Sequence, residues 1–175
     1  MKTKFLTLLV LLSSSIMLAQ DEWQTLEQDN YSISYPKDWV SSDEKPQPSV
    51  LFLLKAPENS QKEDLFRESI NLVSEPLGGQ TLSIEDYVKI SLDQIMAQIP
   101  SAEIKSNKET KLGDEDAREV VWSADFGNGM VLQFKQVYII NNGTAYVLTF
   151  SSTTSEYDAY DEVVNKTLNS FKFSI

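Results

Sequence analysis

MVLQFKQVYIINNGTAYVLTFS, residues 130–151, is the stretch that decides the fold. Asn142-Gly143 separates two runs of strand-forming residues, and Asn-Gly in that position is the strongest short signal of a β-hairpin. The first run is apolar on both of its alternating faces, which predicts a strand that is covered on both sides. We therefore expect an antiparallel hairpin inside a sheet whose two faces are both packed against other elements.

Strand patterns continue before this hairpin. Residues 117–126 precede it across a Gly127-Asn128-Gly129 turn, which predicts a second hairpin. Residues 103–111 form a polar alternating run that carries three lysines, as is typical of the edge of a sheet. Three further strand-like runs lie earlier in the chain, at residues 31–36, 49–55 and 66–75. Consecutive hairpins of this kind predict a mainly antiparallel sheet.

Two helical patterns accompany the strands. Ser83 followed by Asp86 resembles a capping box, and apolar residues then recur at helical spacing until Pro100 ends the pattern. A second apolar stripe predicts a helix over about residues 155–170. Helices packed against a mainly antiparallel sheet give an α+β sandwich. We expect one domain over residues 20–175, with its core at about residues 29–173.

The first residues predict an export signal. Lys2 and Lys4 supply the positive charge, a short apolar run follows, and small residues lead to Ala19. We expect residues 1–19 to be a cleaved signal peptide and the remainder to be secreted or periplasmic. The chain has no cysteine, so no bacterial lipid anchor is expected. The apolar run is too short and too rich in serine for a membrane span, so no transmembrane anchor is expected after cleavage.

Composition excludes several kinds of function. The chain contains no histidine and no cysteine, which removes the usual proton shuttle near neutral pH, the strongest natural nucleophile and the commonest zinc ligands. Its formal net charge of −11 repels the phosphates of nucleic acids. We expect no cofactor, no metal site and no nucleic-acid partner, whereas a cationic patch or peptide suits this charge.

Three local patterns invite a catalytic or metal-binding interpretation, and each has a simpler structural one. Ser42 and Lys45 match the Ser-x-x-Lys pattern of penicillin-recognising enzymes, but the accompanying Ser-Asp-Asn and Lys-Thr-Gly strings are absent, which favours a solvated loop. Asp114-Glu115-Asp116 departs from the calcium-loop pattern and favours a polar turn. Four acidic pairs fall in predicted loops or on helix exteriors: Asp43/Glu44, Glu63/Asp64, Glu85/Asp86 and Asp161/Glu162.

Tyr31-Ser-Ile-Ser-Tyr35-Pro36-Lys-Asp-Trp39 resembles the opening strand and turn of PsbP-like and DcrB-like domains. Segments similar to the family's later elements follow in the same order, including the Asn142-Gly143 hairpin and a last helix that leads to Phe171. The resemblance covers about residues 29–173. It implies a central antiparallel sheet flanked by helices on both faces, and accessory or binding modules rather than a shared reaction.

The leading hypothesis is a non-enzymatic exported module that contacts another envelope or secreted protein. We expect its contact surface at a sheet edge or at the loops Ser41–Pro48 and Pro57–Asp64. The aromatic residues considered for binding are Trp23, Tyr87, Tyr138 and Tyr146. One alternative is a small-ligand carrier with a pocket between sheet and helix, lined by residues such as Tyr87, Tyr138 and Tyr146. Another is a hydrolase that uses Ser42 or a buried carboxylate with a raised pKa.

Overall fold

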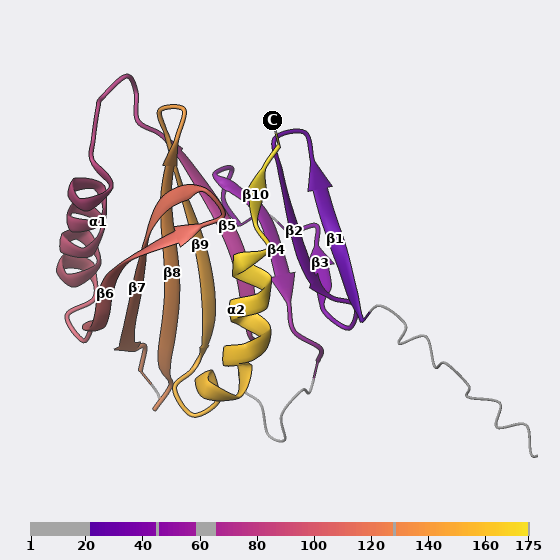
Figure 1. Ribbon diagram of the computed structural model, residues 1–175. Helices are drawn as coiled ribbons and strands as arrows, with labels where there is room; N and C mark the ends of the chain where they lie inside the picture. Colours follow the sequence, from indigo (N-terminus) through magenta and orange to yellow (C-terminus); the bar gives the residue numbers. More distant parts are fainter. Residues whose placement is uncertain (1–21, 45, 59–65, 128, 175) are drawn as a thin grey trace, which may run out of the picture.

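The computed structural model describes residues 22–44, 46–58, 66–127 and 129–174 (Figure 1). The expected signal peptide, residues 1–19, lies outside these residues. The described chain forms a seven-stranded sheet in the order β3-β4-β5-β9-β8-β7-β6 and a three-stranded sheet in the order β1-β2-β10. Every strand pairing in both sheets is antiparallel. The predicted α+β class with a large antiparallel sheet is therefore confirmed.

The elements follow the predicted order. The strands of the large sheet are β3 (Val40–Ser42), β4 (Val50–Lys55), β5 (Ser69–Pro76), β6 (Glu103–Leu112), β7 (Glu115–Asp125), β8 (Val131–Asn141) and β9 (Thr144–Thr153). Those of the small sheet are β1 (Trp23–Gln28), β2 (Tyr31–Pro36) and β10 (Lys172–Phe173). The helices are α1 (Ile84–Gln98), a short 3₁₀ helix at Tyr157–Tyr160 and α2 (Asp161–Asn169). The expected helix over 155–170 is thus a 3₁₀ turn that continues into a shorter α-helix.

The turn between β8 and β9 has the geometry that its sequence predicts. Asn142 and Gly143 have φ values of 49° and 72°, as the two central residues of a type I′ turn require. The strands pair in unbroken register from Asn141 opposite Thr144 to Leu132 opposite Thr153. This hairpin is central, because β7 continues the sheet on one side and β5 on the other.

The small sheet is a feature that the sequence patterns do not predict. Its middle strand, β2, pairs with β1 along its length and with the two-residue strand β10 near the end of the chain. The Ser170 hydroxyl reinforces this junction, because it accepts a hydrogen bond from the Ser34 amide at 2.8 Å. Because β2 and β10 are far apart in the sequence, no local pattern of residues indicates that they pair.

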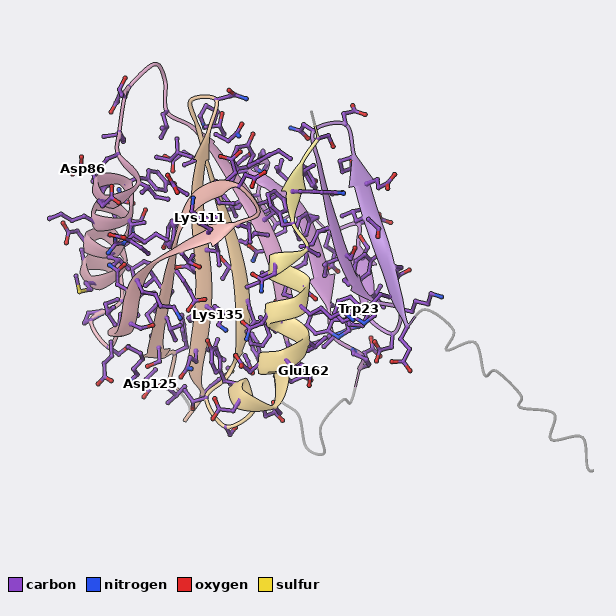
Figure 2. All side chains as sticks on the ribbon, in the orientation of Figure 1. Trp23, Asp86, Lys111, Asp125, Lys135 and Glu162 are labelled. Atoms are coloured by element: carbon purple, nitrogen blue, oxygen red, sulfur yellow. The ribbon has the colours of Figure 1, made fainter. Side chains whose placement is uncertain are left out.

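Helix α1 begins and ends where the sequence indicates. The Ser83 side chain caps it by accepting a hydrogen bond from the Asp86 amide at 3.1 Å. Figure 2 labels Asp86 at this end of the helix. The last helical residue is Gln98, two positions before Pro100. The capping and proline signals therefore predicted the helix correctly.

Two clusters of buried apolar side chains hold the elements together. The first contains side chains of β2, β4, β5, β8, β9 and α2, and it includes Val137 and Ile139. The second contains side chains of β7, β8, β9 and α1, and it includes Tyr138. Alternate residues of β8 thus enter different clusters, which explains why this strand is apolar on both faces. Trp39, 4% exposed, packs its ring edge-on against Tyr160 in the first cluster, as expected for a core residue.

The long strand β6 forms one free edge of the large sheet. Its predicted position is confirmed. Two of its lysines are held by carboxylates of the neighbouring strand, Lys108 by Glu119 at 3.0 Å and Lys111 by Asp116 at 2.9 Å. Lysines on an edge strand oppose pairing with another chain.

A buried lysine joins the sheet to α2. Lys135 on β8, labelled in Figure 2, is 7% exposed, and its Nζ donates hydrogen bonds to Asp161 Oδ1 at 3.0 Å and Asn165 Oδ1 at 2.7 Å. The hydrogen bond from Lys135 lowers the pKa of the Asp161 carboxyl. Because the pKa is lowered in the folded state, the carboxylate contributes stability above its ordinary pKa of 3.8, and this contribution is lost as the pH falls through the lowered value.

We expect Asp161→Asn to reduce the loss of unfolding free energy that the wild type shows as the pH falls. The variant should be less stable than the wild type at neutral pH, and the difference should shrink as the pH falls below about 4, because only the wild type has this carboxylate to protonate. Urea unfolding at a series of pH values measures it. The matched control is Asp38→Asn, an exposed carboxyl in the turn after β2. An equal reduction in both variants would contradict the assignment to Asp161.

Candidate ligand pocket beside helix α1

A pocket of about 300 Å³ opens between α1 and the strands β5, β8 and β9. Its lining is mixed, with apolar side chains on several elements and polar groups on each. The lining residues are Val73, Glu75, Tyr87, Ser91, Gln94, Ile95, Gln98, Ile99, Gln136, Tyr138, Val147 and Thr149. This volume stands at the lower end of the range for small-ligand pockets.

Helical spacing explains why α1 contributes to a pocket as well as to the core. Val88 and Leu92 are buried in the second cluster, which also holds Val120 and Trp122 of β7. Pocket-lining residues follow on the adjacent flank of the helix at spacings of four, three and four, namely Tyr87, Ser91, Gln94 and Gln98. Since α1 packs mainly against β7 and β8, this flank faces strands that the helix does not cover.

The floor of the pocket is a hydrogen-bonded network centred on Gln136. Its Oε1 accepts from the Trp122 indole nitrogen at 2.8 Å and from the Tyr138 hydroxyl at 2.7 Å, and its Nε2 donates to Thr149 Oγ1 at 3.2 Å. These groups come from β7, β8 and β9. Two donors on one oxygen fix the orientation of the amide and leave that oxygen little capacity for a further donor.

The mouth of the pocket carries its charge. Glu75, at the exposed end of β5, is the one charged residue in the lining. Its Oε2 accepts a hydrogen bond from the Tyr87 hydroxyl at 2.6 Å. Burial, together with this contact, raises the pKa of Tyr87, so the phenol stays protonated and donates at neutral pH. The Tyr87 and Tyr138 rings meet edge to face with their centroids 6.2 Å apart.

Two of the four aromatic candidates meet in this pocket, and two lie elsewhere. Tyr87 and Tyr138 line it. Tyr146 packs instead against the first cluster, with its ring 4.9 Å from that of Phe173. Trp23 lies on β1, where Lys166 of α2 places its Nζ 4.0 Å from the ring centroid, a cation–π contact within the chain.

Sequence reasoning missed Glu75, Gln136 and Thr149. Gln136 carries a usable signal, because it interrupts an otherwise apolar face of β8 between Phe134 and Tyr138. A polar side chain in such a position needs a hydrogen-bond partner or a ligand. The other two residues stand on strands whose polar positions are too common to single them out.

The catalytic candidates are dispersed. Ser42 ends the edge strand β3 rather than lying in a loop, and its Oγ accepts from the Glu44 amide at 3.2 Å. Lys45 lies outside the described residues, as do Glu63 and Asp64. The described members of the acidic pairs are all exposed. One fully buried carboxylate that sequence reasoning missed, Glu68, accepts from Ser152 Oγ at 3.2 Å, away from the pocket lining.

The Asp114–Asp116 segment spans the turn between β6 and β7. Asp116 pairs with Lys111, and Glu115 accepts from Asn141 at 3.0 Å. Over the residues that the structure describes, no group of three or more acidic side chains is placed to hold a metal ion. A search of the same residues finds no helix with the length and apolar character needed to cross a membrane.

We expect Gln136→Leu to destabilise the protein by about 2 kcal/mol or more. The substitution leaves the Trp122 indole and the Tyr138 hydroxyl without their acceptor, and each buried donor left unpaired costs roughly 1–3 kcal/mol. Urea unfolding measures the loss. The control is Gln94→Leu, at an exposed lining position on α1, for which we expect a change within about 0.5 kcal/mol. An equal loss of unfolding free energy in both variants would contradict the structural role of the Gln136 hydrogen bonds.

Comparison with solved structures shows the same fold in three bacterial proteins. Cyanobacterial PsbP (CyanoP) from Synechocystis sp. PCC 6803 matches with a TM-score of 0.64 and 13% identity, over 93% of this chain and 99% of that one. LpqN of Mycobacterium tuberculosis matches at 0.62 and 12%, over 89% and 93%. Protein PA94 of Pseudomonas aeruginosa matches at 0.61 and 14%, over 85% and 94%. At these identities the likeness shows the fold alone.

The sequence comparisons identify the family. Comparison with curated proteins gives no match. A family model of PsbP-like proteins matches residues 13–173, which is nearly the whole chain and includes every strand of both sheets. This span agrees with the range over which the Tyr31–Trp39 motif and the later elements resemble that family. The chain therefore belongs to the PsbP-like family.

Proposed function

We propose that this chain is a non-enzymatic accessory protein, exported from the cytoplasm, that acts by binding another envelope or secreted protein. Membership of the PsbP-like family supports a binding role, and LpqN, which has this fold, is described as involved in cell envelope biogenesis. The signal-like residues 1–19 support export. A fold alone does not specify a function, so the case depends on the surface that the chain presents.

The proposed contact surface is the part of the large sheet that α1 leaves uncovered. We take α1 and α2 to lie on opposite faces of this sheet, which the division of alternate β8 residues between the two clusters supports. On the α1 side, Leu53, Asn71 and Thr149 occupy a row across β4, β5 and β9 that continues to Gln136. This row leads directly from the pocket toward β3.

The observation that carries the proposal is that a predicted contact loop and the pocket share one face. Leu54 of β4 enters the first cluster, so its neighbour Lys55 projects from the opposite face. Lys55 forms an ion pair with Glu44, which supports a position of Glu44, within the predicted contact segment Ser41–Pro48, beside that face. We take this segment, the uncovered strands and the pocket mouth as one candidate surface. The loop Pro57–Asp64 falls mostly outside the described residues.

We expect affinity capture from the native cell envelope, after mild crosslinking, to recover one dominant protein with the tagged full-length chain. Gln94→Trp should abolish recovery, because the added ring fills the pocket mouth at an exposed helical position. A variant with residues 41–48 scrambled should lose the same protein. Mass spectrometry of the captured material, with circular dichroism to confirm folding, measures both.

Gln28→Trp is the matched control. It adds the same ring at an exposed position of β1 in the other sheet, and it should capture the protein as well as the wild type does. Recovery of the bait alone would contradict an accessory role. Recovery that survives both surface variants would contradict the proposed surface.

A small-ligand carrier is the second candidate function. The pocket itself is the observation that favours it, because α1, β5, β8 and β9 together supply both apolar surface and hydrogen-bonding groups around one hollow. A carrier would bind its ligand without a protein partner. Bait-only capture combined with a ligand-dependent rise in melting temperature would support this candidate over the first.

A further inference from the structure

We infer that the pocket beside α1 recognises an organic cation, an ammonium or guanidinium group on an aliphatic stem. Resting on the proposed function, the inference assigns this cation to a lysine or arginine side chain of the bound protein. A free amine offers the same chemistry. The two sources are separated by experiment below.

The charge of the pocket is the first argument. Glu75 is the one charged lining residue, and neither lysine nor arginine belongs to the lining. Within the described part of the chain, Glu75 takes part in no ion pair. Arg118 stands opposite Tyr138 in the sheet, but its guanidinium is directed to Glu85, Glu109 and Asn107. The negative charge at the mouth is therefore not neutralised from within.

The orientation of Glu75 is the second argument. The Tyr87 hydroxyl holds Oε2, which leaves Oε1 to accept from a ligand. A hydrogen bond between a cation and a carboxylate is shorter and about twice as strong as one between neutral groups. Tyr87 therefore holds the Glu75 carboxylate in place at the pocket mouth before any ligand binds.

The walls suit the rest of such a ligand. Val73, Ile95 and Val147 offer apolar surface, along which the methylene stem of lysine or arginine packs. The face of an aromatic ring attracts a cation, and the rings of Tyr87 and Tyr138 are both among the lining residues. A pocket of about 300 Å³ has room for one side chain or one small molecule.

An anionic ligand is disfavoured at the same site. It would face Glu75 directly and would also approach a protein whose formal net charge is −11. No lining residue supplies a compensating positive charge. Long-range attraction and the local acceptor thus favour the same sign of ligand.

Trp122 provides a built-in reporter. Its indole N–H donates to Gln136 on the pocket floor, so ligand entry should move that resonance. The chain has three tryptophans, and each gives one indole signal in a ¹⁵N spectrum. Single Trp→Phe variants assign the three signals.

The test is a titration of the ¹⁵N-labelled chain, without residues 1–19, by nuclear magnetic resonance. The probes are N-acetyl-arginine amide and N-acetyl-lysine amide, with N-acetyl-citrulline amide as the neutral isostere of the first. We expect the two cations to shift the Trp122 indole signal and amides of α1, β8 and β9 saturably. The citrulline probe should leave them in place at the same concentrations.

Glu75→Gln should weaken binding of the arginine probe about tenfold, because it keeps the shape and removes the charge. Glu27→Gln, which removes an equal charge from an exposed position on β1, should bind as the wild type does. Equal shifts by the arginine and citrulline probes would overturn the inference. Unchanged affinity in Glu75→Gln would overturn it as well.

Butylguanidine separates the two sources of the cation. If the arginine probe binds as tightly as butylguanidine or more tightly, a protein side chain is supported as the ligand. The pocket then tolerates the two amide groups of the probe, which correspond to a protein backbone. Butylguanidine binding at least tenfold tighter than that of the arginine probe overturns the assignment to a protein side chain and leaves a free small-molecule cation as the ligand. The capture experiment can succeed and depend on this face while neither cationic probe shifts an NMR signal. That result overturns the cation inference and leaves the proposed function standing.

Discussion

The register of the β8–β9 hairpin is the constraint on which the rest of the structure depends. The side chains of a strand alternate between the two faces of the sheet. A shift of one residue in the pairing of β8 with β9 would therefore move every side chain of β8 to the opposite face. Val137 and Ile139 would leave the first cluster, and Tyr138 and Gln136 would leave the pocket. The positive φ values at Asn142-Gly143 prevent this shift. Two turn residues thus position both the core and the candidate site.

Sequence alone predicted the local features well and the distant ones poorly. The hairpin turn, the Ser83 cap and the edge position of β6 each follow from neighbouring residues. The small sheet does not, because β2 and β10 meet across almost the whole chain. Tyr146 lies on the face of the sheet opposite Tyr138, which the geometry of the turn explains. A two-residue loop places Tyr146 opposite Ile139, and therefore on the face away from Tyr138.

The pocket divides its polar groups between those that serve the fold and those left for a ligand. Gln136 Oε1 is occupied by Trp122 and Tyr138, which makes the floor rigid. Glu75 is held on one oxygen and exposed at the mouth. Neither group is placed as a nucleophile beside a base, the arrangement that covalent catalysis requires. A hydrogen-bonded floor beneath one oriented carboxylate is the arrangement on which the proposed recognition depends.

The junction of β2 with β10 makes the first cluster depend on residues from both ends of the described chain. Synthesis produces β1 and β2 first, but α2 and β10, which pair with or pack on β2, come last. The first cluster is therefore complete only when residues 161–173 are in place, because α2 and Phe171 contribute buried side chains to it. The proposed export requires the chain to remain unfolded until it has crossed the membrane. A core that depends on residues 161–173 suits that requirement, because these residues follow all the strands of the large sheet in the sequence.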